Sequence, residues 1–359
     1  MTCATPNFFF RPAIRTTVIG LMAGSLFVGL LPGLTHAQGA AKSTTLDFPK
    51  DAKLIAAAKA EGTVTVYAGP SVAAMRSDAE AFQKTYGVTM TFTQMTGAPM
   101  TARVDQEIKA GRIVADVLIT SDRPSIYRWI ADNQMAKLPD MKFPQQTEFM
   151  APIQSIYQSV LINTSIVSKQ DMPRTWNDLI NPKYAGKIVI GSPRVGTAYS
   201  LLYLALLRDP KYGEAFFEKL AAQRARLVQN NPMVAQLTAS GEAAFGFNGI
   251  PYDATNVVKA NPGAPITYAY LDIVTAAYTY MTVNGRAQHP NAARLFAAWM
   301  MSPAGQVAHN GDNRASSLLG NLPGTLSAPD PKTVRQDITI EKSSMEYSSI
   351  IASFDRIFK

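Results

Sequence analysis

The chain has 359 residues, of which 47% are hydrophobic and 17% charged, and its formal net charge is +8 at pH 7. This length and apolar content exclude global disorder and favour two domains over one. Because no long basic run accompanies the positive charge, the charge does not indicate nucleic-acid binding.

The first 37 residues have the three parts of a secretory signal peptide. Arg11 and Arg15 give a basic start, residues 18–34 are uncharged and mostly apolar, and Thr35-His36-Ala37 forms a small-residue exit. We therefore expect cleavage near Ala37 and a mature periplasmic protein, whose charge falls to +6 because two arginines are removed. The alternative is an uncleaved membrane anchor, which the proline and glycines within the apolar run disfavour.

Few groups that could carry catalysis remain in the mature chain. Cleavage removes the only cysteine, Cys3, so no thiol is left for a nucleophile, a disulfide or a lipid anchor. His289 and His309 stand at expected helix ends, where a capping or solvated role is commoner than metal ligation. With no G-x-S-x-G or H-E-x-x-H motif, we expect no enzyme and no cofactor. A secreted hydrolase assembled from distant Ser, Asp and Glu is the remaining alternative.

The first part of the mature chain alternates between helices and strands. Hydrophobic periodicity predicts helices over 51–61, 75–86 and 101–110 and strands over 63–67, 88–93 and 115–120. Such a β-α-β-α-β order predicts a parallel sheet with helices on both of its faces.

The second part begins with an apolar run over 156–163 that is typical of one long strand. Further helices are predicted over 176–180, 198–207, 212–222 and 231–241, and strands over 187–190, 242–247, 266–271 and 276–283. The C-terminal third is predicted to be mostly helical.

The segment GSPRVGTAYS, residues 191–200, joins a predicted strand to a predicted helix. Such a turn directs backbone N–H groups at an anion. Thr197 follows Gly196 where a nucleotide-binding phosphate loop needs lysine, so catalysis on a nucleotide is not indicated. We expect the hydroxyls of Ser192 and Thr197 and the guanidinium of Arg194 to hold a carboxylate, phosphate or phosphonate. Alternatively, Ser192 only caps the helix and Arg194 is only solvated.

Six segments of the mature chain occur in the order in which one protein family carries them. They are Glu61–Gly69, Phe82–Val88, Asp116–Leu118, Thr175–Ile188, Leu237–Gly246 and His289–Phe296. Together they resemble the type 2 periplasmic substrate-binding proteins of ABC transporters, over nearly the whole mature chain. The resemblance is closest to the branch that contains ferric-iron binders.

This resemblance implies an α/β, two-lobe periplasmic binding protein type 2 fold. Each lobe would be a central sheet flanked by helices, with a ligand cleft between the lobes that closes by hinge motion. Lobe one would comprise residues 38–157 and 276–359 and lobe two residues 158–275, with crossovers at 156–163 and near 268–275. The implied function is a monomeric receptor that delivers a small, anionic solute to an inner-membrane ABC permease and binds no nucleic acid.

The resemblance also implies which residues face the cleft, because ligands of such folds contact helix N-termini and loops after strands. From lobe one these residues are Gly69, Ser71, Thr96, Gly97, Ser121 and Asp122, and from lobe two Ser192, Arg194, Gly196, Thr197, Asn248 and Tyr252.

Ferric iron or an iron chelate is the alternative ligand, but the sequence departs from that branch at both ligand positions. Where its members carry a histidine the chain has Gly69-Pro70-Ser71, and where they carry adjacent tyrosines it reads Asn248-Gly249-Ile250-Pro251-Tyr252. Phenolates of Tyr252, Tyr268 or Tyr270 could still bind a hard cation. Alternating tyrosines more often pack on one strand face, so we expect no metal site.

Overall fold

A computed structural model describes residues 51–95, 97–195 and 199–358. The predicted signal peptide and three predicted cleft residues, Thr96, Gly196 and Thr197, lie outside the described residues. None of the helices in the described part of the chain has the length and apolarity that crossing a membrane requires.

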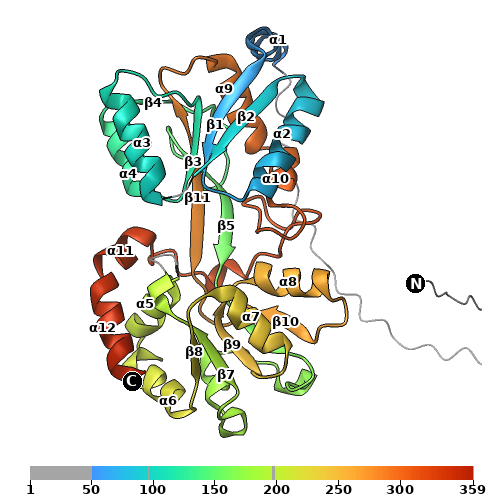
Figure 1. The fold of residues 1–359 in the computed structure, drawn as a ribbon, viewed down its shortest axis with the longest axis vertical. Coiled ribbons are helices and arrows are strands. Elements are labelled where there is room, and N and C mark those ends of the chain that lie inside the picture. Colours follow the sequence, from blue (N-terminus) through green and yellow to red (C-terminus); the bar gives the residue numbers. More distant parts are fainter. Residues whose placement is uncertain (1–50, 96, 196–198, 359) are drawn as a thin grey trace, which may run out of the picture. The chain divides into compact units, whose positions relative to one another are not determined.

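The first lobe is built on a mixed sheet with the strand order β2-β1-β3-β11-β4, and β5 pairs with β11 (Figure 1). The strands are β1 (Thr63–Ala68), β2 (Thr89–Gln94), β3 (Val117–Thr120), β4 (Met135–Ala136), β5 (Ala151–Tyr157) and β11 (Ala276–Asn284). β1 pairs in parallel with β2 and β3, which confirms the predicted parallel unit. β11 returns to this sheet antiparallel to β3 from more than 150 residues further along the chain.

Helices cover both faces of the first sheet, as predicted (Figure 1). They are α1 (Ala52–Glu61), α2 (Val72–Tyr86), α3 (Gly97–Lys109), α4 (Arg123–Ala131), α9 (Pro290–Met300) and α10 (Pro303–Asn310). On one face Phe82 of α2 packs its ring 5.2 Å from Phe296 of α9. On the other face Met100 of α3 and Trp129 of α4 are fully buried in a separate cluster.

The second lobe has a five-stranded sheet with the order β10-β6-β9-β7-β8. Its strands are β6 (Ser159–Asn163), β7 (Ile188–Gly191), β8 (Arg226–Val228), β9 (Phe245–Gly249) and β10 (Ile266–Ala269). Its helices are α5 (Leu201–Arg208), α6 (Gly213–Ala222), α7 (Asn231–Ala239) and α8 (Pro251–Ala260), and the predicted helix over 176–180 is a 3-10 helix. β7 and β9 pair in parallel, whereas β6 is antiparallel to both of its neighbours.

The predicted assignment of all of residues 276–359 to lobe one is wrong at the C-terminus. Helices α11 (Ile340–Met345) and α12 (Tyr347–Ile357) pack on α5 and α6 of the second lobe. Ile350 and Phe354 stand one turn apart on α12 and are buried there, with the ring of Phe354 5.5 Å from that of Tyr203. The apolar face of α12 therefore packs on the second lobe, where it contacts aromatic side chains.

The chain passes between the lobes at adjacent points. The predicted long strand over 156–163 is two strands, β5 and β6, separated at Gln158. The backbone N–H of Gln158 donates to the carbonyl of Thr275 at 3.0 Å, and the Thr275 hydroxyl donates to the Gln158 side chain at 2.7 Å. Both predicted crossovers are therefore present and are joined to each other. A third passage lies beside them, because Val274 and Val334 form a parallel bridge.

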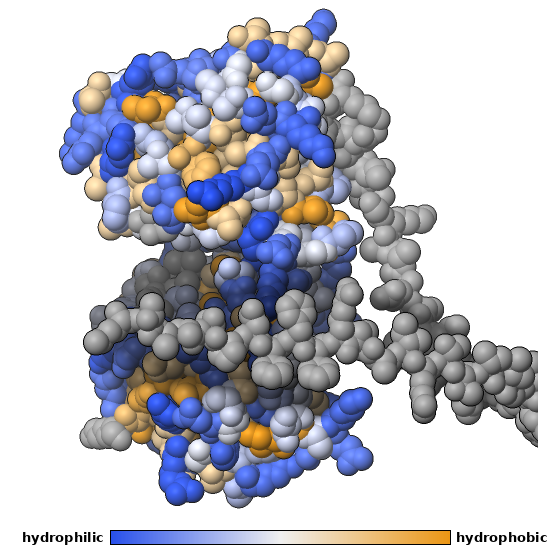
Figure 2. Space-filling model, turned by 45° about the vertical axis from the view of Figure 1, so that its right-hand side comes forward, coloured by the Kyte–Doolittle hydropathy of each residue, from blue (hydrophilic) through white to orange (hydrophobic). Residues whose placement is uncertain are grey.

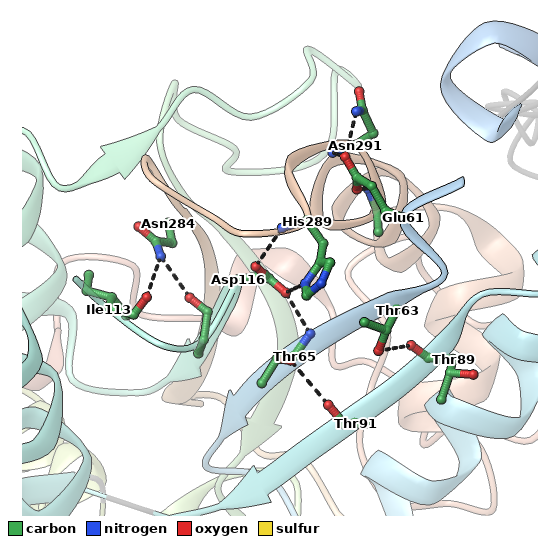
Figure 3. Close-up of polar contacts among 12 residues, drawn as sticks. Glu61, Thr63, Thr65, Thr89, Thr91, Ile113, Asp116, Asn284, His289 and Asn291 are labelled. Atoms are coloured by element: carbon green, nitrogen blue, oxygen red, sulfur yellow. Dashed lines mark hydrogen bonds and ion pairs between the residues drawn. The ribbon is translucent and has the colours of Figure 1, made fainter. Parts of the chain in front are cut away.

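Asp116, directly before β3, ties together three elements of the first lobe (Figure 3). Its fully buried carboxylate accepts hydrogen bonds from the backbone N–H of Thr65 at 2.8 Å and of His289 at 3.1 Å. His289 Nδ1 lies 2.8 Å from the same carboxylate. The role of His289 is thus to hold the start of α9 against β1 and β3, rather than to cap the helix with its ring or to lie in a solvated loop.

His309 lies at a helix end, as predicted, but it is buried rather than solvated. It lies at the end of α10, and its Nδ1 is 2.7 Å from the carboxylate of Asp78 on α2. Both side chains are fully buried, and burial raises the pKa of Asp78. This polar pair joins α2 and α10 within the first lobe.

We predict that Asp116→Asn destabilises the protein by about 2–4 kcal/mol, because an amide places an N–H group where a carboxylate oxygen accepted. Urea unfolding followed by circular dichroism measures the change. Asp132→Asn, at an exposed position on the same lobe, is the matched control and should change stability by less than about 0.5 kcal/mol. Equal stability of the two variants would refute the structural role of Asp116.

Candidate functional site

Strands of both sheets end at the level where the chain crosses between the lobes. β3 is antiparallel to β11, whose first residue follows Thr275 at the crossover, so β3 and its parallel neighbour β1 end facing the second lobe. β9 is antiparallel to β6, which starts next to Gln158, so β9 and its parallel neighbour β7 end facing the first lobe. In Figure 2 a hollow separates the lobes at this level, and hydrophilic residues are visible on its walls.

Three predicted residues of lobe one lie at these strand and helix ends. The N–H of Gly69, after β1, donates to the carbonyl of Ile119 at 2.8 Å. The Ser71 hydroxyl caps α2 by accepting from the N–H of Ala74 at 3.3 Å. Gly97 opens α3 with a φ of 56°, a left-handed conformation that glycine adopts without strain. Their positions fit the prediction, and their contact with a ligand stays a prediction.

Asp122 is the N-cap of α4, and its carboxylate is already engaged. It accepts from the Ser125 hydroxyl at 2.7 Å, from the Ser125 N–H at 3.3 Å and from the Thr101 hydroxyl at 2.8 Å. These bonds fix the start of α4 relative to α3. Ser121, one residue earlier, instead lines a cavity between the lobes.

In lobe two, the loop after β7 contains Ser192 and Arg194. Ser192 is 3% exposed, and its hydroxyl accepts from the N–H of Arg194 at 3.2 Å. The guanidinium of Arg194 is about half exposed and pairs with Asp355 of α12. Binding of an anion by Arg194 would therefore require this exposed ion pair to open, and the role stays a prediction.

Asn248 and Tyr252 lie at the end of β9 and the start of α8. Asn248 is fully buried with a φ of 59°, and its side-chain amide donates to the carbonyl of Tyr199 at 2.8 Å. Its Oδ1 and that of the neighbouring Asn231 have no partner among the described residues. Tyr252 is partly buried in the first turn of α8. These residues make the end of β9 polar, and their contact with a ligand stays a prediction.

The cavity between the lobes has a volume of about 30 Å³. Its walls are Ser121, Arg123, Ala276, Tyr278, Tyr280, Ile338, Thr339 and Glu341, so it is bounded by the end of β3, the start of β11 and the segment that leads into α11. Arg123 Nε and Nη2 donate to the two carboxylate oxygens of Glu341 at 2.5 and 2.9 Å, and Nη1 lies 3.3 Å from the Tyr280 hydroxyl. A bidentate ion pair therefore bridges the two lobes inside this cavity.

Sequence reasoning missed both members of this ion pair. Arg123 follows the predicted residues Ser121 and Asp122 directly, so its place after a strand was a signal that could have identified it. Glu341 lies 218 residues away, and no local pattern marks it as a partner.

The tyrosines near the crossovers pack on one another, as the alternation over 266–271 suggested. The ring of Tyr270 lies 5.6 Å from that of Tyr268 and 5.9 Å from that of Tyr157. Burial raises the pKa of all three hydroxyls, which disfavours the phenolate that a ferric ion needs. Within the described residues no group of three His, Cys, Asp or Glu side chains is placed to hold a metal ion.

Comparison with known proteins identifies relatives of the chain. Residues 68–307 match the model of the bacterial extracellular solute-binding protein family. The chain is 25% identical over 249 residues to the phosphoglycerate transport regulatory protein PgtC of Salmonella typhimurium, which covers 66% of this chain and 60% of that protein. The chain thus spans less than two thirds of the length of this curated relative.

Solved structures share the fold at low sequence identity. Iron-bound HitA from Pseudomonas aeruginosa is 19% identical, with a TM-score of 0.57 over 82% of this chain and 99% of that one. AfuA from Actinobacillus pleuropneumoniae, solved with fructose-6-phosphate, is 20% identical, with a TM-score of 0.52 over 83% and 98%. An ABC-transporter substrate-binding protein from Agrobacterium tumefaciens is 13% identical, with a TM-score of 0.61 over 88% and 97%. These likenesses confirm the predicted two-lobe fold.

We predict that Asp253→Asn stabilises the protein at neutral pH. Burial at the start of α8 raises the pKa of Asp253 to about 6, so the folded protein holds this proton up to a higher pH than the unfolded chain. Its contribution to stability therefore falls as pH rises from about 4 to about 6. Asparagine does not ionise, so the variant avoids this loss of stability. Its free energy of unfolding in urea should exceed that of wild type by about 1–3 kcal/mol at pH 7.5 and by less at pH 4.5. A gain that does not depend on pH would contradict the prediction.

Proposed function

Because the chain belongs to the family of bacterial extracellular solute-binding proteins, we propose that it captures a small anionic solute between its lobes and delivers it to an inner-membrane ABC permease. The observation that carries this proposal is the arginine-containing cavity between the end of β3, the start of β11 and the segment that leads into α11. A guanidinium and several hydroxyl groups there match the acceptor oxygens of an acidic solute.

The chemical class we propose for the solute is a small organic acid that carries a phosphoryl or carboxyl group. The curated relative has phosphoglycerate in its name, and one neighbour with the same fold was solved with a sugar phosphate. Both support a phosphorylated solute. A planar guanidinium binds two oxygens of such a group through two parallel N–H groups, a fixed geometry that an ammonium group lacks.

Capture would proceed by closure of the lobes about the adjacent crossovers at Gln158 and Thr275. Their hydrogen bonds join the passages to each other, so bending there leaves each sheet intact. A solute that contacts both lobes favours the closed state by the extra contacts that it makes there.

For secretion, oligomeric state and enzyme activity we propose what the sequence suggested. The family is extracellular, which supports a secreted protein whose signal peptide is cleaved near Ala37. We propose that it acts as a monomer without enzyme activity, since its relatives are binding and transport proteins. A ferric ion is the weaker alternative because burial disfavours ionisation of the tyrosines near the crossovers.

We predict that the purified mature protein is stabilised by a phosphorylated or carboxylic acid in a thermal-shift screen. A ligand at about 100 times its dissociation constant adds about 2.7 kcal/mol of stability. The screen should include phosphoglycerates, sugar phosphates, inorganic phosphate and citrate, with polyols, amino acids and ferric citrate as contrasts. Stabilisation by a polyol alone would overturn the proposed anionic class, and hydrolysis of any phosphate ester would overturn the proposed role.

We further predict that Arg194→Ala weakens binding of the acid found in the screen by roughly 3-fold to 30-fold. The loss is that of one charge-assisted contact at a half-exposed position, which solvent screens. Arg226→Ala is the matched control, because Arg226 is also exposed in lobe two and forms an ion pair with Glu242. Equal affinities of the two variants in calorimetric titration would exclude Arg194 from the site.

A further inference from the structure

The ion pair between Arg123 and Glu341 stands apart from the exposed ion pairs of this protein. The side chains of Arg123 and Glu341 are 25% and 24% exposed, whereas those of Lys259 and Asp312, which form another bridge between the lobes, are 38% and 69% exposed. The Arg123 guanidinium also lies 5.6 Å from the ring centroids of both Tyr127 and Tyr280. It is held in one orientation by aromatic faces as well as by its carboxylate partner.

The surroundings of this guanidinium are those of a binding position for an acidic group. Ser121 and Thr339 bring hydroxyl groups to the cavity wall, and Tyr280 directs its hydroxyl at Arg123. Burial alone would lower the pKa of Arg123, but its hydrogen bonds to Glu341 outweigh burial and the net change is upward. Because arginine keeps its charge in proteins, the site offers a positive charge and directed N–H donors to an acidic group that takes the place of Glu341.

In this structure the occupant is a carboxylate of the protein itself. The remaining cavity of about 30 Å³ has room for one or two water molecules and not for an organic acid. Glu341 stands in the first turn of α11, a helix of six residues that follows the third passage between the lobes. Because α11 is short and belongs to neither sheet, Glu341 can move away from Arg123 without disturbing the strands.

We propose that Arg123 binds the acidic group of the solute and that Glu341 takes the place of that group while the solute is absent. This inference rests on the proposed function. Glu341 satisfies a partly buried guanidinium that would otherwise lack a carboxylate partner when the site is empty. The solute must displace Glu341, so each molecule that binds replaces the bidentate contact of Glu341 with Arg123 by a contact of its own acidic group.

The test is calorimetric titration of the mature protein with 3-phosphoglycerate, citrate and inorganic phosphate. Glu341→Gln removes the competing charge and should bind the tightest of these acids roughly 3-fold to 30-fold more tightly than wild type. Arg123→Gln should weaken binding at least 10-fold, and Arg123→Lys should recover part of the loss. In the double variant with Arg123→Gln, the gain from Glu341→Gln should disappear.

Asp312→Asn is the matched control for Glu341→Gln. It also removes an ion pair between the lobes, that with Lys259, but Asp312 does not line the cavity. If loosening of the lobes alone improved binding, both variants would bind more tightly. We expect Asp312→Asn to bind within about 2-fold of wild type, and thermal unfolding of every variant confirms that the fold is kept.

The outcomes separate this inference from the proposed function. If wild type binds an acid but Glu341→Gln binds it no more tightly, or Arg123→Gln binds it equally well, the inference is wrong and the proposed function stands. If Glu341→Gln binds an acid that wild type does not bind measurably, both are supported. If neither protein binds any acid, the proposed anionic class and the inference fail together.

Discussion

The pair of hydrogen bonds between Gln158 and Thr275 is the constraint on which the two-lobe arrangement depends. Both side chains are buried, and the bonds hold two passages of the chain at one level between the sheets. Strand direction then follows: β3 must end at this level because β11 begins there, and β9 must end there because β6 begins there. The polar residues after these strands thereby face one another, although they come from distant parts of the sequence.

Among the described residues, two ion pairs that link the lobes differ in how far they are exposed to water. The bridge between Lys259 and Asp312 is exposed, so it contributes little to stability and can open with little change in free energy. The pair of Arg123 and Glu341 is partly desolvated, and separating it without replacement leaves charged groups short of hydrogen bonds. If Arg123 binds the solute as proposed, opening of the cleft and exchange of the partner of Arg123 are coupled.

Local patterns predicted most of the fold, because periodicity and capping act within a few residues. The run over 156–163 shows their limit, since its apolar residues continue through Gln158, where the pairing partner changes from β11 to β9. The placement of α12 on lobe two depends on contacts with Tyr203 that no short-range rule contains. Of the site, the strand-end positions were predictable, but the bond from Arg123 to Glu341 spans 218 residues and was not.

The third passage changes how the two lobes can move. The N–H of Val274 donates to the carbonyl of Thr333, and the N–H of Arg335 donates to the carbonyl of Val274, both at 2.9 Å. The two connections at Gln158 and Thr275 alone would allow the lobes to twist as well as to bend. A third segment that is hydrogen-bonded to one of these connections resists twisting, because twisting would break the bonds at Val274. For the proposed closure we therefore expect bending about a single axis, in which α11 and α12 move with the second lobe that they cover.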